Sequence, residues 1–270
     1  MLEAGGSPSL YQLSFPTRPF SKPVVRPFLT AEWRWLVILD FHVDAALLEP
    51  LVPRGTVLDL WNDRAIVSVV GFRFLDTRVL GVPVPAHRDF DEVNLRFYVR
   101  RELSDGSVRR GVTFVRELVP LPAVALVARA AFNEPYIVRP MRSVAPARPT
   151  DKPGRIHYAW QNPRGWSRLA ATATGDPTKI DPTTRDGFVT DRHWGYTRQR
   201  NGGTIEYQVS HRRWYGWRVD DASLEADIAA TYGPEWSAEL SRAPVSAMIV
   251  DGSAVSVSRP TRLPAPGAGT

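Results

Sequence analysis

The chain has 270 residues, a formal net charge of +6 at pH 7, 43% hydrophobic residues and 23% charged residues. This composition is typical of a globular protein, and the length suits one large all-β domain or two smaller domains. The sequence contains no cysteine, which excludes a disulfide scaffold, thiolate metal sites and a cysteine nucleophile.

The positive charge comes mainly from arginines scattered along the chain, because only Lys22, Lys152 and Lys179 are lysines. A nucleic-acid-binding face needs basic residues gathered in space, so we predict no nucleic-acid partner. The N-terminus lacks a basic region followed by an apolar one, and the longest apolar runs are far shorter than a membrane span. We therefore predict a cytoplasmic protein without a membrane partner. The sequence leaves open whether the protein forms a homo-oligomer.

Strand-forming runs alternate with turns in the first part of the chain. Residues 33–43 and 65–75 are apolar and rich in strand formers, so each predicts a buried strand. Between them, Asp44 is predicted to cap a short helix over residues 45–51, followed by a short strand over residues 56–60.

The central part of the chain predicts a hairpin and a helix. Residues 81–87 contain two prolines and predict a loop before a strand over residues 90–101. A turn at residues 104–106 then leads into a return strand over residues 112–119. Residues 122–132 begin with proline and predict a helix, which we expect to be buried because it is apolar almost all round.

The last part of the chain contains more strand signals. Residues 143–155 are rich in proline, alanine and basic residues, and they are the best candidate for an internal linker. Asp221 is predicted to cap a helix over residues 222–232. Further strands are predicted over residues 156–161, 167–174, 194–199, 204–211 and 247–257.

Taken together, the elements predict an α+β protein dominated by an antiparallel sheet that is closed or strongly curled. We predict one domain over residues 28–258. It would lie between a flexible N-terminal arm over residues 1–27, which holds five prolines, and a disordered tail over residues 259–270.

The strand predicted over residues 90–101 has two chemically different faces. With a period of two, Glu92, Asn94, Arg96 and Tyr98 lie on one side, whereas the other side is apolar. Such a strand suits a sheet that packs outward with its apolar face and lines a polar cavity with the other.

Several phrases of the sequence together resemble one family. They are A-E-W-R-W-L at 31–36, V-D-A-A-L-L-E-P-L-V-P-R-G-T at 43–56, A-I-V-S-V-V-G-F-R-F at 65–74, E-V-N-L-R-F-Y-V at 92–99, A-R-A-A-F-N-E-P-Y at 128–136, and W-G-Y-T-R followed by H-R-R-W. Over about residues 28–258 the chain resembles the YqjF-like conserved family, a domain of unknown function. That family is similar to acetoacetate decarboxylase, which implies a mostly antiparallel β-barrel with an internal cavity and a few short helices.

The resemblance does not carry the decarboxylase chemistry with it. In acetoacetate decarboxylase a lysine forms a Schiff base, and a neighbouring lysine and desolvation lower its pKa. Here the corresponding turn is Asn133-Glu134-Pro135 and is followed by Tyr136, and no lysine lies between Lys22 and Lys152. The resemblance implies that Glu92 takes the place of a cavity glutamate of the decarboxylases and that Arg129 lies in the matching helix.

Each candidate residue has a structural alternative. Glu92 could be a general acid or base, with Arg96 or Arg129 binding a carboxylate or an enolate oxygen and Asn94 beside them. The alternative is a salt-bridge network that fills the barrel and binds nothing. Tyr136 could donate a hydrogen bond to an enolate, or it could only cover the end of the helix.

His87 is a candidate proton shuttle at the cavity mouth, and its alternative is a solvated surface histidine. The histidines are too dispersed for a metal triad to be inferred, and the sequence contains no H-E-x-x-H, G-x-S-x-G or phosphate-loop pattern. We therefore predict no metal and no cofactor. Two functions stay open: binding or transformation of a small organic acid or carbonyl compound, and a non-catalytic ligand-binding or protein-assembly module.

Overall fold

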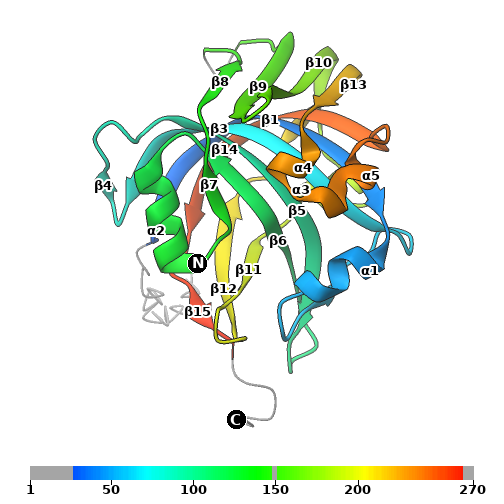
Figure 1. Ribbon diagram of the computed structural model, residues 1–270. Coiled ribbons are helices and arrows are strands. Elements are labelled where there is room, and N and C mark those ends of the chain that lie inside the picture. The colour runs from blue at the N-terminus through cyan, green and yellow to red at the C-terminus, as the bar shows by residue number, and fades with distance from the viewer. Residues whose placement is uncertain (1–26, 148–150, 264–270) are drawn as a thin grey trace, which may run out of the picture.

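A ring of strands forms the centre of the molecule in the computed structural model, which describes residues 27–147 and 151–263. β1, β3, β5 and β6 are successive antiparallel neighbours in one mostly antiparallel sheet. β14 pairs with β1, β12 pairs with β14 and β11, and β11 runs parallel to β6, so that the ring closes (Figure 1). The bounds of these strands are Leu29–Val43 (β1), Ala65–Val79 (β3), Phe90–Glu102 (β5), Val108–Val119 (β6), Trp194–Arg198 (β11), Thr204–His211 (β12) and Ser246–Val257 (β14).

The sheet extends from β14 into a second group of strands, which Figure 1 shows gathered at the top of the molecule. This group comprises β13 (Tyr215–Glu225), β10 (Gly165–Lys179), β9 (Arg155–Asn162) and β8 (Met141–Val144). Four short strands pair with strands of the ring: β2 (Val57–Leu58), β4 (Val82–Pro83), β7 (Tyr136–Val138) and β15 (Thr261–Arg262).

The helices are few and short, which confirms the predicted α+β class. They are α1 (Ala45–Leu48), η1 (Glu49–Leu51), α2 (Pro122–Phe132), α3 (Arg185–Thr190), α4 (Ile228–Thr231), η2 (Pro234–Trp236) and α5 (Ser237–Leu240). The predicted cap at Asp44 is confirmed, because its carboxylate accepts from the backbone N–H of Ala46. No helix of the described ranges is long and apolar enough to cross a membrane.

The two faces of β5 separate the main core from the inside of the ring, as the sequence predicted. Val93, Leu95, Phe97 and Val99 are fully buried in the larger hydrophobic core, together with residues of β9 and β10. Because successive strand residues point to opposite sides, Glu92 and its neighbours at every second position face inward.

A β-bulge in β1 places two nearby tryptophans on opposite sides of the sheet. The pairing of β1 with β3 shifts between Arg34 and Val37, and Trp35 has a φ of 58°. Trp33 consequently lines the inside of the ring, whereas Trp35 lies in the larger core. Gly252 lies opposite the bulge with a φ of +74°, and a Cβ there would lie 1.9 Å from the carbonyl oxygen of Trp33.

Two helix predictions were wrong. Residues 222–225 continue β13 and pair with β10, and the following helix, α4, is capped by Asp227, which accepts from the N–H of Ala230. The pairing with β10 overrides the local helical pattern. The helix α2 forms as predicted but is not buried, because it packs on the ring with one face and leaves Leu126 68% exposed.

The ends of the chain fall only in part within the described ranges. The predicted arm over residues 1–27 lies outside them except for its last residue. The tail predicted from residue 259 is described as far as Leu263, and there β15 pairs with β12 instead of being disordered. The predicted linker over residues 143–155 contains the end of β8 and the start of β9.

Candidate acid–base and ligand-binding site

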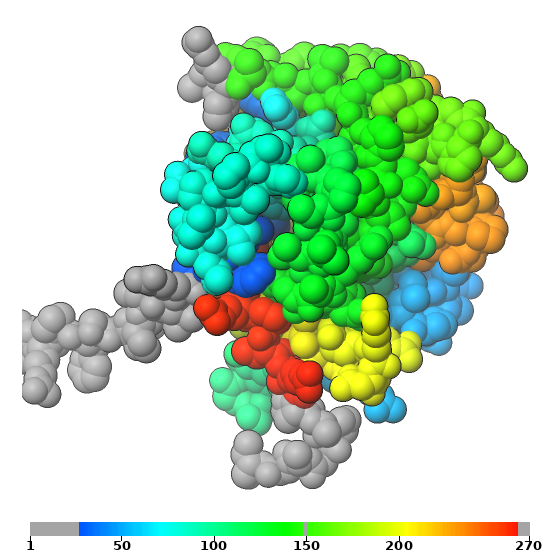
Figure 2. Space-filling view, turned by 60° about the vertical axis from the view of Figure 1, so that its left-hand side comes forward, coloured from blue at the N-terminus to red at the C-terminus, as the bar shows by residue number. Residues whose placement is uncertain are grey.

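The ring encloses a cavity of about 200 Å³. It opens between α2 and the segment that joins β3 to β5, and Figure 2 shows this hollow between the green and cyan surfaces. The lining is mostly apolar and comes from both ends of the chain. Its apolar members include Phe28, Trp33, Leu36, Phe72, Phe74, Phe90, Phe114, Val124, Phe132, Val209 and Trp214.

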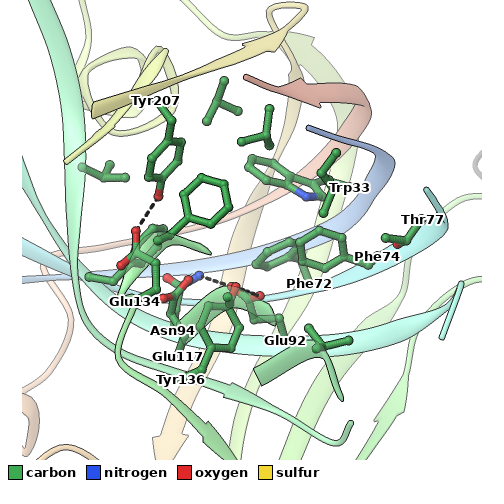
Figure 3. A pocket seen from close by; sticks show the side chains of 18 of the residues that line it. Trp33, Phe72, Phe74, Thr77, Glu92, Asn94, Glu117, Glu134, Tyr136 and Tyr207 are labelled. Carbon is green, nitrogen blue, oxygen red and sulfur yellow. Dashed lines mark hydrogen bonds between the residues drawn. The ribbon is translucent and has the colours of Figure 1, made fainter. Parts of the chain in front are cut away.

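Three glutamates gather on one side of the cavity. Glu92 comes from β5, Glu117 from β6, and Glu134 from the turn after α2, and all three are buried. Glu134 reaches the cavity because Asn133 ends α2 in the left-handed conformation, with a φ of 57°. Figure 3 shows the three carboxyl groups opposite the aromatic side chains of Trp33, Phe72 and Phe74.

Glu92 is held by two neutral hydrogen-bond donors. Asn94 Nδ2 donates to Glu92 Oε1 at 3.0 Å, and the hydroxyl of Tyr136 donates to Glu92 Oε2 at 2.9 Å. Burial raises the pKa of Glu92 from 4.5 to about 7, although these two bonds and the charge of Arg96 oppose the rise. No arginine or lysine of the described ranges lies within ion-pair distance of this carboxyl group, so it can exchange a proton near neutral pH.

The other two carboxyl groups are also kept from ionising easily. Glu134 Oε1 accepts from Thr197 Oγ1 at 2.5 Å and from the hydroxyl of Tyr207 at 2.7 Å, and burial raises the Glu134 pKa to about 7. Burial raises the pKa of Glu117 well above its ordinary value, and the charges of Glu134 and Glu92 add to this rise. The cavity therefore holds protonatable carboxyl groups rather than a set of fixed negative charges.

Two arginines, Arg96 and Arg192, also line the cavity. Arg192 Nη1 pairs with Asp59 at 2.5 Å, and both of these side chains are buried. Arg96 makes no ion pair with any carboxylate of the described residues, and its Nη2 donates only a long bond of 3.4 Å to the carbonyl oxygen of Val189. Both guanidinium groups lie over the ring of Tyr98, at 5.9 Å for Arg96 and 4.9 Å for Arg192.

His211 and Trp214 form another part of the wall, and they belong to a stack of three rings. The ring of His211 lies between those of His193 and Trp214, at centroid distances of 4.6 Å and 4.3 Å. Burial lowers the pKa of His211, and both of its ring nitrogens face backbone carbonyl oxygens, those of Arg212 and Arg192. The stack is therefore a packing wall for the cavity.

The structure brings together five of the six residues predicted for the site. Glu92, Asn94, Arg96, Tyr136 and His87 all line the cavity, and His87 Nδ1 faces the carbonyl oxygen of Pro85.

Arg129 is not among the residues that line the cavity. It is exposed on α2, and its Nε donates to the backbone carbonyl oxygen of Tyr136 at 2.8 Å. It therefore fixes the chain after the helix end rather than binding an anion inside the ring.

Sequence reasoning missed Glu117, Glu134, Arg192 and Tyr207 as site residues. In β6 the reason is a bulge: the pairing with β5 shifts between Leu95 and Arg96, so Phe114 and Glu117 both face the cavity although they are three residues apart. A strict period of two places Glu117 on the outer face. The other residues come from turns and from distant strands, whose approach no local pattern reveals.

The described lysines lie away from this site. Lys152 pairs with Asp176 at the surface, and Lys179 is exposed at the end of β10. No described residues form a group of three or more histidine, aspartate and glutamate side chains arranged to hold a metal ion.

The fold belongs to the acetoacetate-decarboxylase-like class. Acetoacetate decarboxylase from Legionella pneumophila superposes with a TM-score of 0.63 at 12% identity, over 91% of this chain and 93% of that one. An acetoacetate decarboxylase-like enzyme from Sphingomonas wittichii gives 0.60 at 14%, over 87% and 92%. The enduracididine biosynthesis enzyme MppR, complexed with pyruvate, gives 0.60 at 13%, over 96% and 99%.

The family itself is shown by the sequence. The model of the DUF2071 family, described as an uncharacterized conserved protein, matches residues 30–253, and the chain belongs to this family. No curated protein matches the chain. The likeness to the decarboxylases establishes the fold alone, because the identities are low.

Proposed function

We propose that this protein binds a small organic acid or carbonyl compound inside the ring, with Glu92 as the acid–base group. The observation that carries the proposal is that Glu92 is free of arginine in an open cavity. A salt-bridge network that filled the ring would instead pair this carboxyl group with Arg96 and leave no room for a ligand.

The surrounding groups suit proton transfer next to a carbonyl. As a carboxylate, Glu92 would remove a proton from the carbon beside a carbonyl group. The electron pair of that C–H bond would form the C=C bond of an enolate, and the π pair of the carbonyl group would move onto its oxygen. The guanidinium of Arg96 is a donor for such an oxygen or for a carboxylate, whereas the hydroxyl of Tyr136 already donates to Glu92. Return of the proton from Glu92 completes the cycle without a lysine Schiff base.

The fold neighbours support a carbonyl acid as the ligand class. MppR, which has the same fold, is described in complex with pyruvate, a small carbonyl acid. We use pyruvate as the probe for this chain.

The second candidate function is a non-catalytic ligand-binding or assembly module. Leu126 favours it, because this apolar residue of α2 is exposed and does not line the cavity. Such a module needs no proton transfer in the cavity, which gives a direct way to separate the two functions.

The test is exchange of the pyruvate methyl protons in D2O, followed by proton NMR with and without the protein. We expect protein-dependent exchange that Glu92→Gln lowers by about a hundredfold, the usual contribution of a general base. Glu102→Gln, at the exposed end of the same strand, is the matched control and should leave exchange unchanged. Pyruvate binding without exchange would favour the non-catalytic module. The absence of both pyruvate binding and proton exchange would overturn the proposal.

A further inference from the structure

The acidic side of the cavity has more hydrogen-bond acceptors than donors. Glu117 Oε2, Glu134 Oε2 and Asn94 Oδ1 are buried atoms without a hydrogen-bond partner in the structure. The donors of this region are already used, because Tyr136 and Asn94 Nδ2 serve Glu92, and Tyr207 serves Glu134. An ionised carboxyl group has no donor of its own, and buried polar atoms in folded proteins are normally paired. In the ionised state this excess therefore calls for donors from a ligand.

A metal ion does not fit these acceptors, since the described carboxyl groups do not form a metal-binding arrangement. An organic ammonium or guanidinium group fits them better, because it carries three to five N–H donors and no acceptor. Asn94 supports this choice independently of the carboxyl groups. Its unpaired amide oxygen does not titrate, so it remains an acceptor at any pH.

Two residues further along β5, the unpaired atom is a donor and not an acceptor. Arg96 Nε is a buried donor without a partner, and this guanidinium has no carboxylate partner among the described residues. Asn94 and Arg96 lie on the same face of β5, about 7 Å apart along the strand. The cavity thus presents free acceptors and a free cationic donor side by side.

We infer that the ligand of the cavity is a small zwitterion, an organic acid that also carries a protonated amine or a guanidinium group. Its carboxylate pairs with Arg96, and its cationic nitrogen lies against Glu117, Glu134 and Asn94. The aromatic wall of Trp33, Phe72 and Phe74 covers the body of the molecule. This inference rests on the proposed function, because it names the substrate class of the same site.

Binding of such a cation has a consequence for protons. Burial raises the pKa of Glu92 and of Glu134 to about 7, so these two groups are partly protonated near pH 7, and burial also raises the pKa of Glu117. A cationic nitrogen beside them favours the ionised form. Binding of a zwitterion at pH 7 should therefore release protons, whereas binding of an acid without the amine should not.

Three matched probes separate the two ends of the site. They are 4-(aminomethyl)benzoate, with both charges, 4-methylbenzoate, with the acid alone, and 4-methylbenzylamine, with the amine alone. By isothermal titration calorimetry we expect 4-(aminomethyl)benzoate to bind about tenfold or more tightly than either of the others. Repeating its titration at pH 7 in buffers of different ionisation enthalpy should show the proton release.

Variants then test which side chains contact the cationic nitrogen of the ligand. Glu117→Gln should remove most of the advantage of 4-(aminomethyl)benzoate over 4-methylbenzoate. Glu225→Gln, at an exposed carboxylate that pairs with Arg168 outside the ring, is the control and should leave this advantage unchanged. If Glu117→Gln fails to fold, as judged by circular dichroism, the probe comparison and the proton release in the unchanged protein decide the question.

The outcomes distinguish this inference from the proposed function. Equal binding of 4-(aminomethyl)benzoate and 4-methylbenzoate, with both weakened by Arg96→Gln, would overturn the zwitterion and leave the organic-acid site standing. A lack of binding by every carboxylate probe, together with no exchange of pyruvate protons, would overturn both.

Discussion

The hydroxyl of Tyr136 in β7 donates to Glu92 Oε2 in β5 at 2.9 Å, across the intervening strand β6. Two elements that are far apart in the chain thus meet at the one carboxyl group of the site that has donors on both oxygens. The phenol stabilises the ionised form of Glu92 and works against burial, so that the Glu92 pKa comes to lie near neutrality.

Tyr136→Phe should raise the pKa of Glu92 above its value of about 7, because the bond from the phenol to the carboxylate is lost. Carbon-13 NMR of labelled glutamate carboxyl groups across a pH titration measures this directly. Tyr215→Phe, at an exposed tyrosine on β13, is the control. An unchanged or lower Glu92 pKa in Tyr136→Phe would contradict the bond.

Glu134→Gln should become more stable relative to the unchanged protein as the pH rises. The Glu134 pKa is about 7 in the folded chain, against an ordinary value of 4.5 that applies to the unfolded chain. The protonated carboxyl group therefore stabilises the folded state fully below pH 4.5, and this stabilisation is lost as the pH rises through 7. Glutamine cannot ionise, and both donors to Glu134 bind Oε1, so the variant can keep those bonds.

The difference in the free energy of unfolding between Glu134→Gln and the unchanged protein should move by as much as about 3 kcal/mol between pH 4.5 and pH 8. Urea denaturation at several pH values measures it. Glu102→Gln, an exposed carboxyl at the end of β5, should show a much flatter curve. A flat curve for Glu134→Gln as well would mean that Glu134 ionises normally in the folded state.

Asp59→Asn should lower the free energy of unfolding by about 3–5 kcal/mol, because it leaves the buried guanidinium of Arg192 without its charged partner. Lys152→Ala removes an ion pair at the surface and should cost less than about 1 kcal/mol. Chemical denaturation of the two variants gives the comparison. Similar small losses in both would show that the Asp59–Arg192 pair is not a structural support of the cavity.

Gly195→Ala should disturb the site through Tyr207. A Cβ at Gly195 would lie 2.1 Å from the Tyr207 ring, so the ring must move, and its bond to Glu134 lengthens or breaks. Overpacking of this kind costs about 1–3 kcal/mol of stability. Gly154→Ala is the matched control, because a Cβ there meets no atom within 4 Å.

Thermal unfolding of the two glycine variants tests this expectation, and binding of 4-methylbenzoate reports on the cavity. A Gly195→Ala protein that is as stable as Gly154→Ala would contradict the close approach of Gly195 to the Tyr207 ring.

The sequence by itself determined the strands of the ring and the two faces of β5. Alternation in residues 90–101 separates Glu92, Asn94 and Arg96 from the apolar core residues, and a period of two is a local property of a strand. The absence of lysine between Lys22 and Lys152 likewise excluded a Schiff base at the expected position before any fold was known.

Only the tertiary structure decided the rest of the site. Bulges in β1 and β6 shift the alternation, so Trp33 and Glu117 face the cavity where a regular strand would point them elsewhere. Glu134 and Arg192 arrive through ring closure between segments far apart in the chain. The excess of unpaired acceptors beside a free guanidinium follows from that closure, because only packing determines which buried polar atoms find partners.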